Sequence, residues 1–164
     1  MQSNSSKSDM WLDKVATLIE SLPYMKQYSG LSVVIKFGGH AMGEQASIEA
    51  FARDIVFLQQ VGAKPIVVHG GGPQIGSMLA RLEMESNFID GLRVTDQQTI
   101  SIVEMVLAGA INKSLVTSIS AAGGMSVGIS GKDGNLMIAK KLTHRTKDTD
   151  SRSEEHTSEL QSPM

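Results

Sequence analysis

The 164-residue sequence has no cysteine, which excludes a disulfide framework and a thiolate metal site. Aromatic residues are scarce, at 4%, and no apolar run approaches the roughly 20 residues that a membrane span needs. Neither sign of charge dominates: the net charge is −2, which gives no electrostatic case for nucleic acid or an acidic membrane surface. The polar start, Met1 to Asp9, lacks the apolar core of a secretory signal. These absences predict a cytoplasmic protein with no nucleic-acid or membrane partner.

Glycine, in contrast, is plentiful, and two clusters of it directly follow apolar runs. The first closes the run Val33–Gly39 (VVIKFGG), and the second lies in Ile66–Pro73 (IVVHGGGP). Glycine lets a backbone approach an anion closely, and a helix that starts after such a turn offers unpaired N–H groups and the positive end of its dipole. Two such units, the first led by a lysine, indicate phosphoryl chemistry on a small acid.

The periodicity of apolar residues predicts an α/β fold. The alternation of strands and helices favours a sheet with parallel members, helices on both faces, and the first two strands buried on both faces. Ligands in such sheets bind at the carboxyl ends of the strands, so both glycine clusters are expected to face one crevice. Helices are predicted at 10–22, at 46–61, from Pro73 onward and at 95–122, where Thr95 and Gln98 form a capping box. Strands are predicted at 31–37, 65–69, 125–129 and 136–140. Turns are predicted at Asp90-Gly91 and at 131–135.

The last thirteen residues, 152–164, have one aliphatic side chain besides the terminal Met and no periodicity. Their order resembles the translation of a common sequencing-library adapter, and a disordered tail is the alternative. On the first interpretation the segment is a non-native tail, the natural sequence stops near Ser151, and the chain is an N-terminal piece of a longer protein.

Three motifs resemble the N-acetylglutamate kinase family of the amino-acid kinase superfamily. They are Ile35–Met42 (IKFGGHAM), His69–Pro73 (HGGGP) and Gly91–Thr95 (GLRVT), supported by Ala108–Lys113 and Ser130–Asn135. The likeness covers roughly residues 11 to 151. It implies a three-layer αβα sandwich of the amino-acid kinase type, with residues 31–151 as an incomplete substrate-binding lobe and residues 1–30 as an extension that carries an amphipathic helix.

The resemblance assigns the phosphoryl side of the site to the first motif. It places Lys36 where a lysine stabilises the transferring phosphoryl group, and Gly38 and Gly39 where backbone N–H groups reach the same group. Phosphoryl transfer needs positioning and positive charge more than covalent help, so these residue types suit the chemistry. A surface lysine at a strand end and an ordinary βα turn are the structural alternatives.

The resemblance assigns the substrate side to the other two motifs. Gly71 and Gly72 match the backbone grip near the carboxylate that becomes phosphorylated, and Arg93 matches the arginine that pairs with the substrate's α-carboxylate. A guanidinium holds a carboxylate bidentately. A solvated arginine beside a hairpin is the alternative. The HGGG run also occurs in the oxyanion hole of lipase-like hydrolases, but this sequence lacks the G-x-S-x-G elbow of that fold.

The implied activity is ATP-dependent phosphorylation of the side-chain carboxylate of N-acetyl-L-glutamate in arginine biosynthesis. Mg²⁺ would accompany ATP, and the sequence shows no metal ligands. The remaining catalytic residues would belong to a nucleotide-binding lobe beyond this sequence, so the chain alone is expected to be inactive. A homodimer is implied, and the N-terminal helix would either join dimers into arginine-inhibited hexamers or pack on its own subunit. Glutamate 5-kinase, carbamate kinase and a non-catalytic ligand-binding fragment are the alternative functions.

Overall fold

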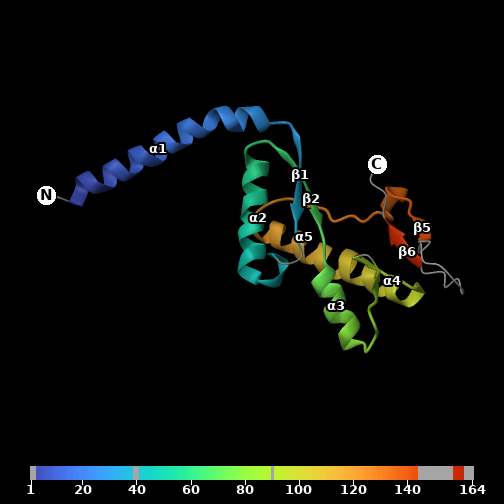
Figure 1. The fold of residues 1–164 in the computed structure, drawn as a ribbon. Coiled ribbons are helices and arrows are strands. Elements are labelled where there is room, and N and C mark those ends of the chain that lie inside the picture. Colours follow the sequence, from blue (N-terminus) through green and yellow to red (C-terminus); the bar gives the residue numbers. More distant parts are fainter. Residues whose placement is uncertain (1–2, 39–40, 90, 144–156, 161–164) are drawn as a thin grey trace, which may run out of the picture.

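The fold is built around a parallel βαβ unit. Strand β1 (Ser32–Phe37) pairs with β2 (Lys64–His69), in register from Ser32 opposite Lys64 to Phe37 opposite His69, and helix α2 (Gln45–Gln60) connects them (Figure 1). Gly62, which follows α2, has φ +90°, a conformation that glycine adopts without steric cost. The predictions for these three elements are confirmed. The computed structural model describes residues 3–38, 41–89, 91–143 and 157–160.

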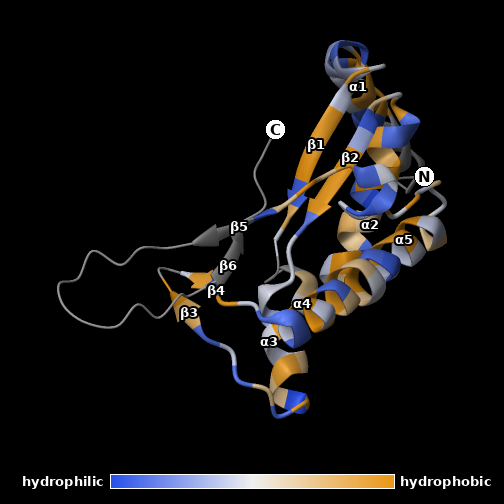
Figure 2. Ribbon diagram, turned by 90° about the vertical axis from the view of Figure 1, so that its right-hand side faces the viewer, coloured by the Kyte–Doolittle hydropathy of each residue, from blue (hydrophilic) through white to orange (hydrophobic). Residues whose placement is uncertain are grey.

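One face of the β1–β2 sheet is covered and the other is open in the described part of the chain. Helices α2 and α5 (Asn112–Ala121) lie on the same side of the two strands (Figure 2). On the opposite face, Val34, Ile66 and Val68 are 67%, 51% and 49% exposed. The α/β class is confirmed, but the prediction that both strands are buried on both faces is wrong here, because no described helix lies over the second face.

The core lies between the sheet and the helices. A first cluster joins the end of β1 to α3 (Gly72–Arg81) and the long helix, and a second joins α2 to α5. Phe37 stacks on Phe51 of α2 with ring centroids 4.0 Å apart. The buried members of the first cluster are Phe37, Met42, Ile75, Leu79, Val106, Ile111 and Leu115, and those of the second are Ala52, Ile55 and Ile119.

The long helix predicted at 95–122 is continuous but contains a π-helical turn. It consists of α4 (Gln97–Glu104), the π-helix η2 (Met105–Ile111) and α5. Its N-cap is Asp96, whose carboxylate accepts a hydrogen bond from the Thr99 backbone N–H at 2.7 Å. The predicted Thr95–Gln98 capping box is therefore wrong by one position, because the residue with extended backbone and a side chain within reach is Asp96.

The segment Gln97–Ala121 is long and apolar enough, by length and composition, to cross a membrane. That criterion is weak evidence, because the core helix of a globular protein also meets it. Here Val106, Ile111, Leu115 and Ile119 of this helix are buried against other elements of the chain.

A short hairpin follows α3. Strands β3 (Phe88–Ile89) and β4 (Leu92–Arg93) pair antiparallel, with Phe88 opposite Arg93. Gly91 has φ +78°, as the predicted turn requires, while Asp90 of that turn lies outside the described residues. The hairpin prediction is confirmed with shorter strands than expected.

The predicted strand 125–129 is wrong, since this run has no ladder partner among the described residues. Its Val and Met side chains favour extended backbone, but side chains of α2 and α5 donate hydrogen bonds to its backbone carbonyl groups. Met125 and Val127 are 89% and 87% exposed. The bonds run from Gln59 Nε2 to Met125 O (2.8 Å), Lys113 Nζ to Gly128 O (2.9 Å) and Asn112 Nδ2 to Ile129 O (3.3 Å), and Ser126 Oγ donates to Val116 O (3.2 Å).

The C-terminal strands also differ from prediction. After the turn helix η3 (Asp133–Asn135), strand β5 occupies Lys140–Thr143 rather than 136–140 and pairs antiparallel with β6 (Thr157–Leu160). Strand β6 lies within 152–164, so a wholly disordered tail is wrong for Thr157–Leu160. The non-native origin of this segment stays a prediction.

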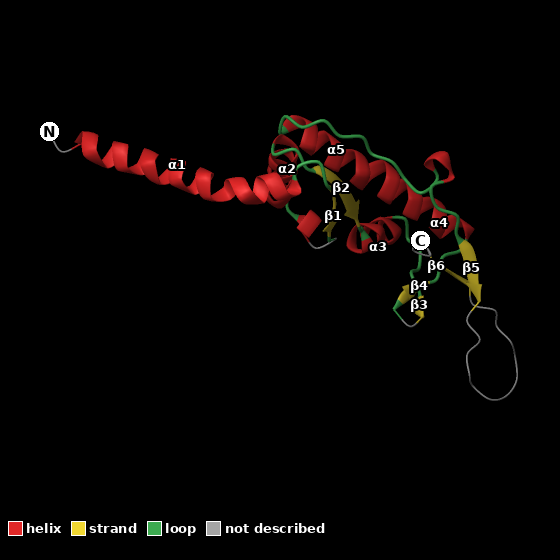
Figure 3. Ribbon diagram, turned by 90° about the horizontal axis from the view of Figure 1, so that it is seen from above, coloured by secondary structure: helices red, strands yellow, loops and turns green. Residues whose placement is uncertain are grey.

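The N-terminal helix α1 (Ser3–Tyr28) is longer than the predicted 10–22 and contains Pro23. It projects away from the rest of the chain (Figures 1 and 3). Its apolar side chains are therefore open to solvent, with Trp11 60% and Leu12 65% exposed.

Candidate functional site

The two glycine clusters meet at one edge of the sheet. Because β1 and β2 are parallel and in register, Phe37 and His69 end the two strands side by side. The Gly70 N–H donates to the Phe37 carbonyl at 3.3 Å, which ties the two loops together just beyond the strands. The prediction that the two strands bring both loops to the carboxyl edge is confirmed for Gly38 and for residues 70–72, whereas a crevice between the loops stays a prediction.

Gly71 and Gly72 open helix α3 at this edge. Gly71 is the N-cap residue, and its carbonyl accepts the Ile75 N–H at 2.9 Å. Gly72 is exposed, and Pro73 lies in the first turn, where a missing N–H disturbs no intrahelical bond. The first N–H groups of an α-helix have no intrahelical partner and lie at the positive end of its dipole. This edge is therefore suited to an anion.

The φ of Gly71 does not by itself require glycine. Its φ of 171° is extended backbone that any residue adopts. Glycine is needed for space, since a Cβ here would lie 2.5 Å from Ile111 Cδ1 and 2.6 Å from Leu107 Cδ2. Sequence reasoning missed these two residues of η2, because nothing local marks them as neighbours of the loop.

Lys36 is the penultimate residue of β1 and is exposed. In register it lies opposite Val68, on the open face of the sheet. Within the described part of the chain its side chain takes part in no ion pair or hydrogen bond. Its ammonium group is thus available to a ligand at the carboxyl edge.

Gly38 follows directly and is also exposed, and a Cβ on it would meet nothing within 4 Å. The structure therefore gives no steric reason for glycine at this position. Gly39, the other residue predicted to contact the phosphoryl group, lies outside the described residues. A role for the pair stays a prediction.

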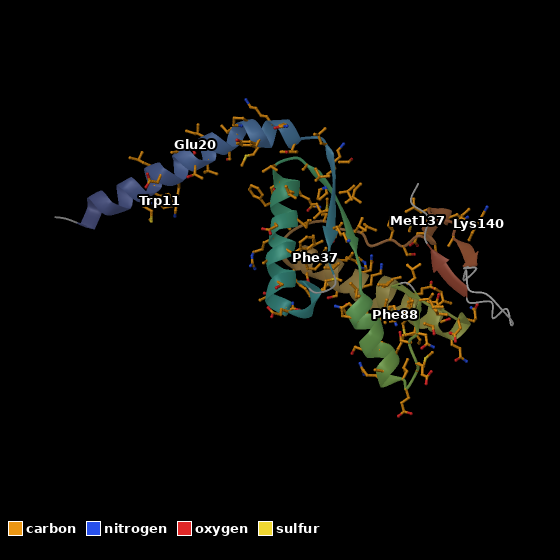
Figure 4. All side chains as sticks on the ribbon, in the orientation of Figure 1. Trp11, Glu20, Phe37, Phe88, Met137 and Lys140 are labelled. Atoms are coloured by element: carbon orange, nitrogen blue, oxygen red, sulfur yellow. The ribbon has the colours of Figure 1, made fainter. Side chains whose placement is uncertain are left out.

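Arg93 is fixed on the hairpin rather than by the glycine loops. Its Nη1 donates to Ser86 Oγ, and its guanidinium carbon lies 4.6 Å from the centroid of the Phe88 ring. Figure 4 shows Phe88 away from Phe37, which ends β1. Sequence reasoning missed Ser86 and Phe88, although the hairpin register, which sets Phe88 opposite Arg93, could have indicated the stacking.

Two carboxylates near these elements have lowered pKa values. The hydrogen bond from the Thr99 backbone N–H lowers the pKa of Asp96. The backbone N–H of Ser130 (2.5 Å) and then its hydroxyl (2.9 Å) lower the pKa of Asp133. Asp96 thus caps helix α4, and Asp133 stabilises the turn that contains Ser130.

No three His, Asp or Glu side chains come together in the part of the chain that the structure describes. A cavity of about 310 Å³ lies between the long helix and residues 130–139, and its lining includes Glu104, Leu107 and Lys132. The 2.5 Å ion pair between those two residues is exposed.

Parallel strands that end in glycine-rich loops, one of which opens a helix, define the class of α/β proteins that bind small anionic ligands at the carboxyl edge of a sheet. The sequence matches the Amino acid kinase family over residues 32–162. The chain belongs to this family.

Curated relatives agree with the family. The chain is 59% identical over 141 residues to the acetylglutamate kinase of Rhodospirillum rubrum, covering 86% of the chain and 46% of that protein. It is 60% identical over 131 residues to the acetylglutamate kinase of Novosphingobium aromaticivorans, covering 80% and 43%. The chain thus spans about half the length of the relatives that it matches.

Solved structures share the fold. The N-acetylglutamate synthase of Neisseria gonorrhoeae complexed with coenzyme A and N-acetyl-glutamate aligns with a TM-score of 0.59 at 26% identity, over 80% of this chain and 30% of that one. The same synthase complexed with coenzyme A and L-arginine gives 0.58 at 23% identity, over 82% and 32%.

Proposed function

We propose that this chain supplies the substrate-binding half of an acetylglutamate kinase, which phosphorylates the side-chain carboxylate of N-acetyl-L-glutamate to give N-acetylglutamyl 5-phosphate in cytoplasmic arginine biosynthesis. The observation that carries the proposal is the junction of the two glycine loops at the carboxyl edge of β1 and β2, beside Lys36, whose side chain has no partner among the described residues. The relatives named acetylglutamate kinase support the choice of substrate.

Each proposed residue has a physical task. The backbone N–H groups of Gly71 and Gly72, at the start of α3, hold the carboxylate that accepts the phosphoryl group. Arg93 binds the α-carboxylate. Lys36, with the backbone of Gly38 and Gly39, stabilises the charge that spreads over the transferring phosphoryl oxygens.

ATP supplies the phosphoryl group, and Mg²⁺ accompanies it in the proposed reaction. Among the described residues, no three carboxylate or histidine side chains come together to hold this ion. We propose that a second half of the complete protein, which this chain lacks by comparison with its relatives, binds the nucleotide. Made by itself, the chain is then inactive as a kinase.

Domain organisation and assembly belong to the same proposal. Residues 1–30 form the extension that carries α1, residues 31–151 the substrate lobe and residues 152–164 a non-native tail. The complete enzyme is a homodimer. The exposed apolar residues of α1, such as Trp11 and Leu12, support a role in joining dimers into hexamers that arginine inhibits.

Calorimetric titration of the 164-residue chain tests the proposal. We expect N-acetyl-L-glutamate to bind at least about tenfold more tightly than N-acetyl-L-glutamine, which lacks the side-chain carboxylate and its charge-assisted hydrogen bonds. L-Glutamate, which lacks the acetyl group, is the second comparison. Tighter binding of L-glutamate would favour a glutamate 5-kinase, and no difference among the three would contradict the proposed site.

An enzyme that joins this chain to the remaining half of the Rhodospirillum rubrum relative tests the reaction itself. We expect ATP-dependent acyl-phosphate formation with N-acetyl-L-glutamate and none from the 164-residue chain alone. Activity with carbamate instead would identify a carbamate kinase. A joined enzyme that binds the substrate without turnover would favour a non-catalytic binding module.

A further inference from the structure

The π-helix η2 lies directly against the loop that carries Gly71. The side chains of Leu107 and Ile111 end 2.6 Å and 2.5 Å from where a Cβ of residue 71 would stand. Gly71 is buried, whereas its neighbour Gly72 is exposed and has open space around it. The loop backbone therefore packs on these two side chains at the N-cap residue of α3.

The π-turn determines which side chains reach the loop. Along the long helix, buried residues follow one another at Val106, Ile111, Leu115 and Ile119, so one step spans five residues and the others four. In an uninterrupted α-helix, Ala110 would succeed Val106 on the buried face. In this structure Ala110 is exposed and Ile111 is buried. The extra residue of the π-turn thus rotates Ile111 onto the core face, against Gly71.

We infer that Leu107 and Ile111 are positioning residues, which set the depth of the loop and so the direction of the Gly71 and Gly72 backbone N–H groups. Residue 71 must be glycine because the π-helix fills the space of a side chain there. This inference rests on the proposed function, which uses these N–H groups to hold the substrate carboxylate. π-Turns occur frequently at functional sites, and this one faces the helix start that the proposed function uses.

The test compares the substitution Gly71→Ala in two backgrounds. The first is the native chain, and the second carries Leu107→Ala and Ile111→Val, which together remove the Cδ2 and Cδ1 atoms that a methyl group would meet. We expect Gly71→Ala to lower the thermal midpoint by about 4–8 °C in the native background. In the background with Leu107→Ala and Ile111→Val, Gly71→Ala should lower the thermal midpoint by less than half as much.

Gly76→Ala is the matched control. Gly76 lies one turn further along α3, and a Cβ there meets nothing within 4 Å. Its effect on the thermal midpoint should be the same in both backgrounds. Equal losses from Gly71→Ala in the two backgrounds would show that η2 does not restrict residue 71, and would overturn the inference.

The positioning role needs a measurement that general destabilisation does not change. We expect Leu107→Ala to shift the amide resonances of Gly71 and Gly72 in the nitrogen–proton spectrum and to weaken N-acetyl-L-glutamate binding about tenfold. Leu115→Ala, a core truncation two turns further along the helix, should leave both unchanged. If the two variants behave alike, Leu107 only fills the core. If the native chain does not bind N-acetyl-L-glutamate, the proposed function fails, while the amide shifts still decide whether η2 positions the loop.

Discussion

Replacing Gly128 by alanine should displace residues 125–130, which follow the long helix, from their contact with α5. A Cβ at this position would lie 1.8 Å from Asn112 Oδ1, 2.7 Å from Asn112 Cγ and 2.9 Å from Val116 Cγ2. These neighbours belong to α5, and Asn112 also donates to the Ile129 carbonyl. The methyl group therefore cannot be accommodated unless Asn112 moves or the segment lifts away from the helix.

The cost can be built from these contacts. Forcing a methyl group into a well-packed contact costs about 1–3 kcal/mol. Moving Asn112 also breaks its hydrogen bond to Ile129, which adds about 1 kcal/mol. The free energy of unfolding should fall by about 2–4 kcal/mol, which corresponds to a lowering of the thermal midpoint by about 4–16 °C for a chain of this size.

Urea unfolding followed by circular dichroism measures this loss, with Gly109→Ala as the control. Gly109 lies in the π-helix, and a Cβ there meets nothing within 4 Å. Combining Gly128→Ala with Asn112→Ala should recover part of the loss, because the closest atoms are then gone. A Gly128→Ala variant within about 0.5 kcal/mol of the native chain would refute the seating of residues 125–130 on α5.

Four other changes test the core, a cap and the two charged residues of the proposed site. Leu79 is 1% exposed, so Leu79→Ala should lower the free energy of unfolding by about 2–5 kcal/mol in urea titrations. The native pKa of Asp96 lies below its usual value of 3.8 because the Thr99 N–H stabilises the carboxylate. Its contribution to stability is therefore complete above about pH 4 and lost as the pH falls through the lower native pKa. In Asp96→Ala, the fall of the thermal midpoint on acidification should therefore be smaller than in the native chain. Lys36→Ala should leave the thermal midpoint unchanged, because Lys36 is exposed and unpaired in the described chain. The same change should lower kcat of the joined enzyme about 100-fold or more. A rise in KM for ATP alone would contradict the proposed role of Lys36. Arg93→Ala should mainly raise KM for N-acetyl-L-glutamate, and an unchanged KM would remove Arg93 from the site.

The βαβ unit and its glycine edge could be predicted because their signals are local. The Val- and Ile-rich run of β1, the glycine after α2 and the proline in the first turn of α3 each specify the conformation of their own neighbourhood. Two parallel strands then bring both loops to one edge whatever the rest of the chain does. The positions of Lys36, Gly71 and Gly72 followed from this reasoning.

The remaining features depend on partners that are distant in sequence. The run Met125–Ile129 has the composition of a strand, but side chains of α2 and α5 bind its main chain. The π-turn is marked by no residue of its own and is recognised only from which side chains are buried. Likewise, Ser86 and Phe88 hold Arg93 through tertiary geometry that no local motif encodes.

The short span of the βαβ unit has a consequence for the order in which the chain folds. The ladder pairs Ser32 with Lys64 and Phe37 with His69, a separation small enough for early closure. Because synthesis proceeds from the N-terminus, β1, α2 and β2 can assemble before residues 97–121 have been made. The glycine-rich carboxyl edge of the sheet then forms early in an approximate geometry, and the long helix fixes its final geometry when it docks.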